Sequence, residues 1–319
     1  MTDITKPPAC FDPANIPADT AACGREIVAR LTAAADMWSV APQTVRDLRA
    51  AGKGTFPLPP RSPRAETLRI DGPHGPVALR VIAPDNPRGA FLHIHGGGWV
   101  LGAADQQDDR LERLAGNCGL AVVSVEYRLA PEFPYPQGPD DCEAAALWLV
   151  GEGARHFATS KFFIGGESAG AHLSVVAMLR LRDRHGLTPF AGANLVAGCY
   201  DLAMTPSVRN WGDEKLVLCT RDIENFVGRF LCAGGDTADP DISPIHADLR
   251  GLPPAFFTVG TSDLLLDDSL FMHQRWLAAG NDAELAVYPG GMHVFTGFPE
   301  LDQAQDALAR AEAFIGGLL

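Results

Sequence analysis

The chain has 319 residues, of which 46% are hydrophobic and 20% are charged, and its formal net charge at pH 7 is −13. The hydrophobic and charged fractions are ordinary for a soluble globular protein. The negative charge argues against nucleic acid as a partner and disfavours an anionic membrane surface, because both require a basic face. A neutral or cationic small substrate is compatible with this charge, whereas a highly anionic one would be mildly repelled.

The N-terminal residues 1–8 lack the basic and apolar regions of a signal peptide, and no apolar run reaches the roughly 18 residues of a membrane span. We therefore expect a cytoplasmic protein. The chain has seven cysteines, which form neither a CxxC pair nor a zinc-binding spacing: Cys10, Cys23, Cys118, Cys142, Cys199, Cys219 and Cys232. We expect them to be buried, reduced thiols.

The first 60 residues have helical patterns and no strand. Apolar residues between Ile27 and Trp38 recur at helical spacing and predict a helix over Thr20–Trp38. A short helix is expected over Gln43–Ala51, and the Gly- and Pro-rich segment 52–64 ends it. Because these helices precede any sheet, we interpret residues 1–60 as a cap segment on a catalytic domain that spans residues 61–319.

Strand and helix patterns alternate in the rest of the chain. Strands are expected at Glu66–Asp71, Val77–Ala83, Gly89–Ile94, Ala121–Glu126, Lys161–Gly165, Ala193–Cys199, Ala255–Val259 and Glu284–Tyr288. Helices are expected at Gln106–Cys118, Asp141–Val150, Ala171–Leu179, Leu265–Ala279 and Ala304–Leu319. This alternation predicts an α/β fold with a doubly wound, mostly parallel sheet whose first two strands are antiparallel. A helical insertion at about residues 205–231 would complete the cap.

One motif lies between a predicted strand and a predicted helix. Residues 166–170 read Gly-Glu-Ser-Ala-Gly, which matches the G-x-S-x-G pattern of a nucleophile elbow. The flanking glycines are required because a turn this tight leaves no room for a Cβ. The motif is short enough to arise by chance, but its strand and helix context makes Ser168 a candidate nucleophile.

A serine nucleophile needs a base, and the base needs a third group that orients it. In α/β-hydrolases these follow the serine in the order acid, then histidine. His293 lies in a Gly-rich loop after the last predicted strand, where ligand sites of α/β proteins gather. Asp263 follows an earlier strand, and we favour it over its neighbours Asp267 and Asp268, which we expect at the start of a helix.

A glycine triplet follows the strand at Gly89–Ile94, in the run His-Gly-Gly-Gly-Trp over residues 95–99. Consecutive glycines let main-chain N–H groups approach a substrate oxygen, as an oxyanion hole requires. The N–H of Ala169, at the start of a helix, would add another donor.

Together these motifs resemble the hormone-sensitive-lipase-like family of α/β-hydrolase esterases. Residues 95–99 resemble its HGGG[FW] motif, residues 166–170 its G-[DE]-S-A-G elbow, and residues 127–132 with Asp140 and Asp141 its YRLAPE…D stretch. The resemblance implies a triad of Ser168, Asp263 and His293. It also implies oxyanion donors at Gly97, Gly98 and Ala169, no cofactor or metal, and a homodimer as a fair expectation.

The sequence departs from the family pattern at a few positions. The acid motif lacks the proline of D-P-x-x-D after Asp263, and Glu126 replaces the Asp that often precedes the Tyr-Arg pair. Trp99 in place of Phe is also found in kynurenine formamidases. The leading hypothesis is therefore a serine esterase for short- to medium-chain acyl esters. The alternatives are an arylformamidase or amide hydrolase and, less favoured, a non-catalytic binding protein.

Candidate pocket walls come from aromatic residues in the least patterned parts of the chain. Each of them could equally belong to the core. They are Phe11, Trp38, Phe56, Trp99 and Trp211.

Overall fold

A single mixed sheet organises the chain in the computed structural model, which describes residues 8–319; residues 1–7 of the expected cap segment lie outside this range. Eight strands follow the order β1-β2-β4-β3-β5-β6-β7-β8. They are β1 (Glu66–Ile70), β2 (Val77–Ile82), β3 (Gly89–Ile94), β4 (Leu120–Glu126), β5 (Phe162–Glu167), β6 (Phe190–Val196), β7 (Ala255–Ser262) and β8 (Ala283–Met292). The pairs β1–β2 and β2–β4 are antiparallel and the others are parallel, so the predicted doubly wound α/β fold is confirmed.

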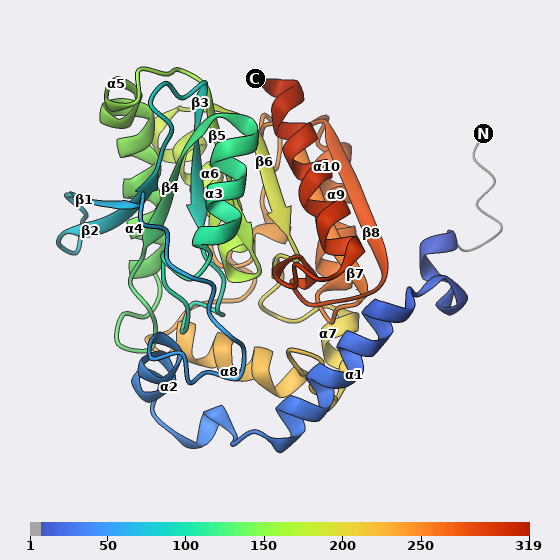
Figure 1. The fold of residues 1–319 in the computed structure, drawn as a ribbon. Coiled ribbons are helices and arrows are strands. Elements are labelled where there is room, and N and C mark those ends of the chain that lie inside the picture. The colour runs from blue at the N-terminus through green and yellow to red at the C-terminus, as the bar shows by residue number, and fades with distance from the viewer. Residues whose placement is uncertain (1–7) are drawn as a thin grey trace.

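Helices cover both faces of the sheet (Figure 1). On one face lie α4 (Gln137–Trp148), α6 (Ala169–His185) and α9 (Leu266–Ala278), and on the other α3 (Asp108–Cys118) and α10 (Asp302–Leu318). A π-helical turn at Leu149–Gly153 continues α4 into the short α5 (Ala154–His156). Short 3-10 helices lie at Ala9–Phe11, Pro13–Asn15, Met37–Ser39, Pro244–His246 and Phe295–Gly297.

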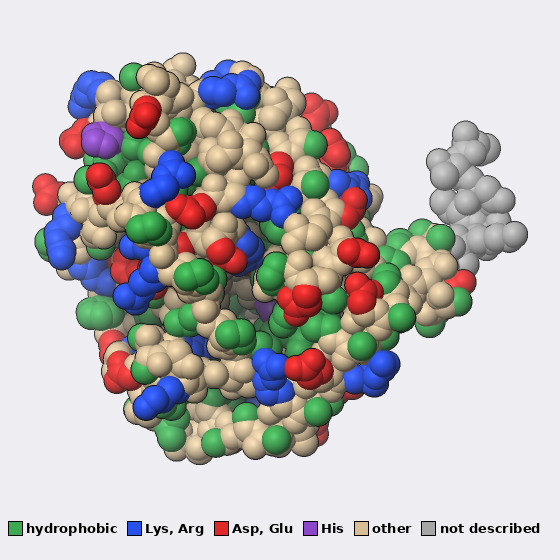
Figure 2. Space-filling model, viewed as in Figure 1, with side chains coloured by type: hydrophobic (Ala, Val, Ile, Leu, Met, Phe, Trp, Pro, Cys, Tyr) green, Lys and Arg blue, Asp and Glu red, His purple; other side chains and the backbone are tan. Residues whose placement is uncertain are grey.

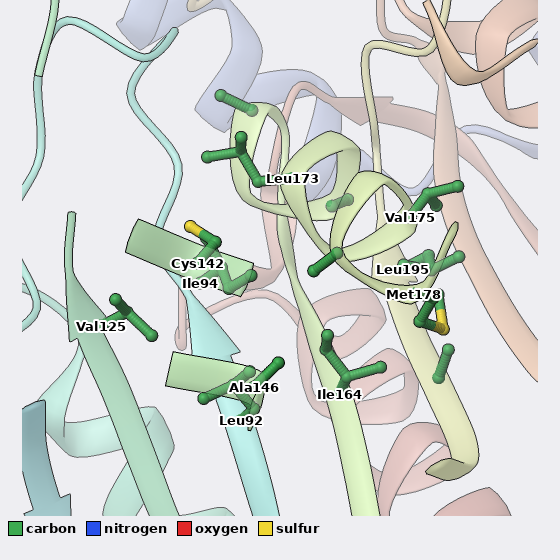
Figure 3. Packing of buried hydrophobic residues seen from close by; sticks show 14 of the residues in the cluster. Leu92, Ile94, Val125, Cys142, Ala146, Ile164, Leu173, Val175, Met178 and Leu195 are labelled. Carbon is green, nitrogen blue, oxygen red and sulfur yellow. The ribbon is translucent and has the colours of Figure 1, made fainter. Parts of the chain in front are cut away.

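The core lies between the central strands and the helices α4 and α6. Ile94 and Ile164 on neighbouring strands, Leu173 on α6 and Cys142 on α4 are all fully or almost fully buried (Figure 3). All six residues of β3 are buried, because parallel strands of this fold are covered on both faces. The core therefore fixes β3 and β5, whose C-terminal ends carry the glycine triplet and Ser168.

Four further helices lie across the C-terminal edge of the parallel strands (Figure 1). They are α1 (Ala18–Ala33), α2 (Pro42–Ala50), α7 (Pro206–Trp211) and α8 (Thr220–Phe230). Trp38 joins the N-terminal pair to α8: its Nε1 donates to Asp222 Oδ1 at 2.6 Å, and its ring meets Phe226 edge-on at 4.8 Å. The Arg229 guanidinium lies over the same ring at 4.5 Å. Segments far apart in sequence thus form one layer above the strand ends.

Several element boundaries differ from the sequence prediction for identifiable reasons. The helix α4 starts at Gln137, before the predicted Asp141, because Pro139 lies in the first turn, where its missing N–H is not needed. The helix α1 ends at Ala33 rather than Trp38. The strands β7 and β8 continue to Ser262 and Met292, past a register shift at Gly260. As a result, the two longer strands lead directly to Asp263 and His293.

The cysteine prediction is confirmed only in part. All seven thiols are free, but burial holds for four of them: Cys118, Cys142, Cys199 and Cys219. Cys10 and Cys23 are partly exposed and Cys232 is exposed, which contradicts the expectation for these three. Within residues 8–319, no helix is long and apolar enough to cross a membrane. The same residues contain no group of three or more His, Cys, Asp or Glu side chains that could hold a metal ion.

Candidate active site

Ser168 occupies a strained turn between β5 and α6. Its backbone has φ 56° and ψ −120°, a conformation that non-glycine residues rarely adopt. A Cβ at Gly166 or Gly170 would lie 2.0 or 1.9 Å from the carbonyl oxygen of Ile94, so the flanking glycines let β5 and α6 approach β3. The strand–turn–helix expected from the sequence is therefore present, and the glycine requirement has an explicit steric cause.

Asp263 and His293 meet at the ends of neighbouring strands β7 and β8. The Nδ1 of His293 lies 3.0 Å from each carboxylate oxygen of Asp263, and both side chains are buried. The Leu265 N–H also donates to Asp263 Oδ1 at 2.9 Å, which fixes the carboxylate. This arrangement favours the tautomer with the proton on Nδ1 and leaves Nε2 of His293 able to accept a proton.

Ser168 and His293 line the same cavity, but no hydrogen bond joins Ser168 Oγ to His293 among residues 8–319. Such contacts are often long in ligand-free active sites and tighten when substrate binds. The structure thus brings Asp263 and His293 into direct contact and places Ser168 in the cavity that His293 also lines.

The rival acids Asp267 and Asp268 lie in the first turn of α9, as expected, and point elsewhere. Asp267 accepts the Ser207 N–H at 2.8 Å. Asp268 accepts the Tyr200 N–H at 2.6 Å and the Thr205 hydroxyl at 2.7 Å. Both carboxylates therefore tie the segment after β6 to α9 and make no contact with His293.

The glycine triplet forms a tight loop beside Ser168. Gly97 has φ 119° and Gly98 has φ 60°, and a Cβ at Gly97 would lie 2.2 Å from the carbonyl oxygen of Leu101. Only glycine fits a loop that folds back this closely on itself. The Leu101 N–H closes the loop by donating to Gly97 O at 2.8 Å. In the described part of the chain, the N–H groups of Gly97, Gly98 and Ala169 donate to no backbone carbonyl. They remain available to an oxygen in the cavity.

Buried aromatic and imidazole groups support this loop from behind. His95 stacks on Tyr127 at 4.2 Å, and the Tyr127 hydroxyl donates to His95 O at 2.9 Å. Burial lowers the pKa of His95 to about 4, so its ring is neutral at pH 7. Trp99 Nε1 donates to Nδ1 of His172 at 3.1 Å. These contacts fix the glycine loop, whose three glycines bring no side chain to the cavity, while His95 and Trp99 on either side of them line it.

The other motif residues are structural. Glu126 accepts the Ala104 N–H at 2.8 Å and so anchors the chain after the glycine loop. The backbone N–H and the guanidinium of Arg128 both donate to Asp141, at 2.9 and 2.5 Å. Asp140 accepts from Arg180 at 2.9 Å. Residues 127–132, together with Asp140 and Asp141, therefore hold the end of strand β4 to the helices α4 and α6.

The cavity above the serine has a volume of about 710 Å³. Figure 2 shows the molecule hollowed on this side, with hydrophobic and charged side chains around the opening. Apolar walls come from α1, α8 and the adjoining loops: Ile27, Leu31, Phe56, Leu218, Ile223, Phe226, Val294 and Phe298. Of the predicted aromatic walls, Phe56 and Trp99 line the cavity, whereas Trp38 packs behind Phe226. Phe11 and Trp211 are not among the lining residues.

Sequence reasoning missed a charged network next to Ser168. Glu167 lies 3.2 Å from His93 Nε2 and 3.7 Å from Arg110 Nη1, and Arg110 donates to Thr296 Oγ1 at 3.2 Å. Burial alone would raise the pKa of Glu167, but Arg110 and His93 lower it to about 2. Nothing in the spacing of α3 distinguishes Arg110 from a surface charge, so only the fold brings these groups together.

Comparisons with known proteins agree with this geometry. A family model described as the alpha/beta hydrolase fold matches residues 91–297. The chain is 33% identical over 227 residues to an acetyl-hydrolase of Streptomyces hygroscopicus, covering 70% of this chain and 74% of the relative. It is 30% identical over 257 residues to an acetyl esterase of Salmonella choleraesuis, covering 78% of each.

Solved structures extend the likeness to nearly the whole chain. A hormone-sensitive lipase from a metagenome library superposes with a TM-score of 0.81 and 27% identity, covering 95% of this chain and 99% of that one. The residues that resembled this family in sequence thus lie in the same fold as a protein described by that name. The chain belongs to the hormone-sensitive-lipase-like family of α/β-hydrolase esterases and is a carboxylic ester hydrolase.

Proposed function

We propose that this esterase hydrolyses short- to medium-chain acyl esters through a covalent acyl-enzyme, with Ser168 as nucleophile, His293 as base and Asp263 as the orienting acid. The observation that carries the proposal is the contact of Asp263 with His293 Nδ1 at 3.0 Å in the cavity that also contains Ser168. A buried carboxylate on Nδ1 leaves Nε2 to exchange protons with the serine.

Each step of the proposed reaction uses groups already described. Ser168 Oγ attacks the ester carbonyl carbon as His293 Nε2 takes the hydroxyl proton. The N–H groups of Gly97, Gly98 and Ala169 donate to the resulting oxyanion, and each such donor contributes roughly 3 kcal/mol. Collapse of the intermediate expels the alcohol, which receives the proton from His293. Water then attacks the acyl-enzyme as His293 takes its proton, and the acid leaves as Ser168 Oγ receives that proton from His293.

The substrate range follows from the cavity. Its apolar walls at Ile27, Leu218 and Phe226 suit an acyl chain, and the two relatives named for acetyl groups support a small acyl group. We further propose that residues 8–60 and the insertion at 205–231 act as a cap, because both contribute walls to the cavity. The homodimer implied by the family resemblance stays a prediction.

A panel of p-nitrophenyl esters from acetate to decanoate tests this function. The expected result is turnover that peaks at short to medium chain length and falls by at least about 10³-fold in Ser168→Ala, because the nucleophile is lost. A fluorophosphonate probe should label the parent protein at Ser168, as located by mass spectrometry. Undiminished turnover in Ser168→Ala, or none in the parent, contradicts the proposal.

A control separates the chemistry from the fold. Ser39 ends the short 3-10 helix at Met37–Ser39, and its side chain is exposed. The variant Ser39→Ala should keep the activity of the parent. Circular dichroism of Ser168→Ala should match the parent, so that lost turnover reports the missing hydroxyl.

A further inference from the structure

Two of the cations that line the cavity have carboxylate partners. Arg30 pairs with Glu26 at 2.5 Å, and Arg110 lies 3.7 Å from Glu167. The remaining lining cations are Lys215 and Arg49. Each engaged pair satisfies its own charges, so these groups are poor candidates for recognising a charged substrate.

Lys215 also has an anionic neighbour. The pKa of Asp36 is lowered first by the Trp38 N–H, and Arg221 and Lys215 lower it further. Asp222, another lining acid, accepts from Trp38 Nε1 at 2.6 Å and from the Cys219 N–H at 2.9 Å. Asp36 and Asp222 are therefore already hydrogen-bonded, and Lys215, which forms no hydrogen bond or ion pair within residues 8–319, acts on Asp36 through its charge alone.

Arg49 differs from Arg30 and Arg110, which have carboxylate partners, and from Lys215, whose charge acts on Asp36. Within residues 8–319, its guanidinium takes part in no hydrogen bond and in no ion pair, although Asp109 and Glu300 also line the cavity. The residue is partly buried, and burial lowers the pKa of its guanidinium. Withdrawal of a guanidinium from water without a partner is costly, and an anionic ligand would offset that cost.

The position of Arg49 is fixed by its surroundings. One turn earlier on α2, Arg46 donates to Val100 O at 2.8 Å and to Ala130 O at 2.6 Å, which attaches that face of the helix to the chain next to the glycine loop. Residues three apart share a helix face, so Arg49 lies on the same side. A Cβ at Gly54 would lie 3.0 Å from Arg49 Cγ, because the turn after α2 folds over the stem of the side chain. The head group is thus held at the cavity wall.

We propose that Arg49 is an anion subsite that selects esters carrying a carboxylate remote from the scissile bond. This inference rests on the proposed esterase function. A guanidinium binds a carboxylate through two parallel N–H···O bonds, and the apolar walls near Phe226 accommodate the spacer between the carboxylate and the ester. The net charge of −13 repels anions at long range, but salt screens that field within about 10 Å, whereas the contact pair persists.

Matched ester pairs test the subsite. On the acyl side, the monoester 4-nitrophenyl adipate is compared with 4-nitrophenyl hexanoate; on the alcohol side, 4-acetoxybenzoate is compared with phenyl acetate. Arg49→Ala should lower kcat/KM for the carboxylate ester of at least one pair by about 10- to 100-fold, the range expected for hydrogen bonds to a charged group. The neutral esters should stay within about twofold, since they make no ionic contact with Arg49.

Two further variants control for packing and for general charge. Arg49→Gln keeps most of the stem and should behave like Arg49→Ala if the guanidinium is what matters. Arg30→Ala removes a lining cation that is already paired with Glu26 and should leave the ratio of charged to neutral turnover unchanged. A ratio unaltered by Arg49→Ala and Arg49→Gln in both ester pairs overturns the proposal.

Failure of the esterase function would be visible separately, as an absence of turnover of the neutral esters. In that case, binding of adipate is measured instead, as the change in thermal unfolding that adipate causes in the parent and in Arg49→Ala. Stabilisation by adipate in the parent that is lost in the variant supports the subsite. Equal stabilisation of both proteins, or of neither, overturns it.

Discussion

At the scale of single residues, Gly98 packs directly against α8, the helix that contributes Phe226 to the cavity wall. Its φ is 60°, and a Cβ there would lie 2.3 Å from Cγ of Phe226 on α8. The residue therefore has no room for a side chain on the side that faces α8. The same closeness means that any addition at Gly98 displaces either the glycine loop or Phe226.

Gly98→Ala is expected to lower kcat/KM for p-nitrophenyl butyrate by roughly 10- to 100-fold, because small displacements of catalytic donors have effects of that size. Gly116→Ala is the matched control, since a Cβ at that position on α3 meets nothing within 4 Å. It should keep full activity and gain slightly in stability, as alanine favours helix. Full activity in Gly98→Ala would show that the loop tolerates movement.

The sequence alone could predict residues whose chemistry is local. The common placement of Ser168, Asp263 and His293 was predictable because each follows a strand, and strand ends of a parallel sheet share one edge. Arg49 and Arg110 were not, because their significance depends on which acids lie near them after folding. The boundary of α4 was missed because Pro139 indicates a break in sequence but fits the first turn of a helix.

At the scale of elements, Glu167 links the strand that leads to Ser168 to the loop that carries His293. It immediately precedes Ser168 at the end of β5, and through Arg110 on α3 it reaches Thr296 in the 3-10 helix that follows His293. His93 continues the network to Ser124 on β4 through a contact of 2.8 Å. The network thus spans strands β3, β4 and β5 and reaches the 3-10 helix after His293.

Glu167→Gln should therefore affect both stability and catalysis. Removing the charge leaves Arg110 partly buried without its anion, a change that typically costs about 3 kcal/mol or more of unfolding free energy. We expect kcat to fall more than KM changes, because the loop bearing His293 loses its support. Urea unfolding and steady-state kinetics measure the two effects.

A neighbouring acid provides the comparison for this prediction. Asp109 on α3 lines the same cavity and, within residues 8–319, forms no ion pair. Asp109→Asn should change the unfolding free energy by less than about 0.5 kcal/mol, as surface substitutions usually do. Equal stability and equal kcat in Glu167→Gln and the parent would mean that the network has no positioning role.

At the scale of the whole molecule, buried side chains that the fold keeps uncharged make the free energy of unfolding depend on pH below neutrality. Burial lowers the pKa of His95 and of His172 to about 4, below the 6.5 of an exposed imidazole. His172 has a geometric reason as well, because its Nδ1 accepts from Trp99 Nε1 at 3.1 Å while its Nε2 donates to Ile242 O at 2.8 Å. A second proton on this ring would face a donor.

The opposite sign holds for one buried acid. Burial raises the pKa of Asp268 to about 7, although Thr205 and two backbone N–H groups oppose the shift. A carboxyl whose pKa is raised on folding favours the folded state as pH falls from 7 towards 3.8, which partly offsets the histidines. The pH dependence of the parent alone therefore mixes both contributions, and a variant is needed to separate them.

The histidine contribution has a defined pH window. Between pH 6.5 and 4 the unfolded chain binds protons that folded His172 does not, so the stabilisation is complete above 6.5 and is lost as pH falls towards 4. From pH 7.5 to 5.5 this one imidazole should account for about 1 kcal/mol of the loss in unfolding free energy. Urea unfolding at both pH values should therefore show a smaller pH difference in His172→Gln than in the parent. The exposed His156 serves as control: His156→Gln should keep the parent's difference, and the same pH difference in all three proteins would mean that His172 takes up its proton in the folded state.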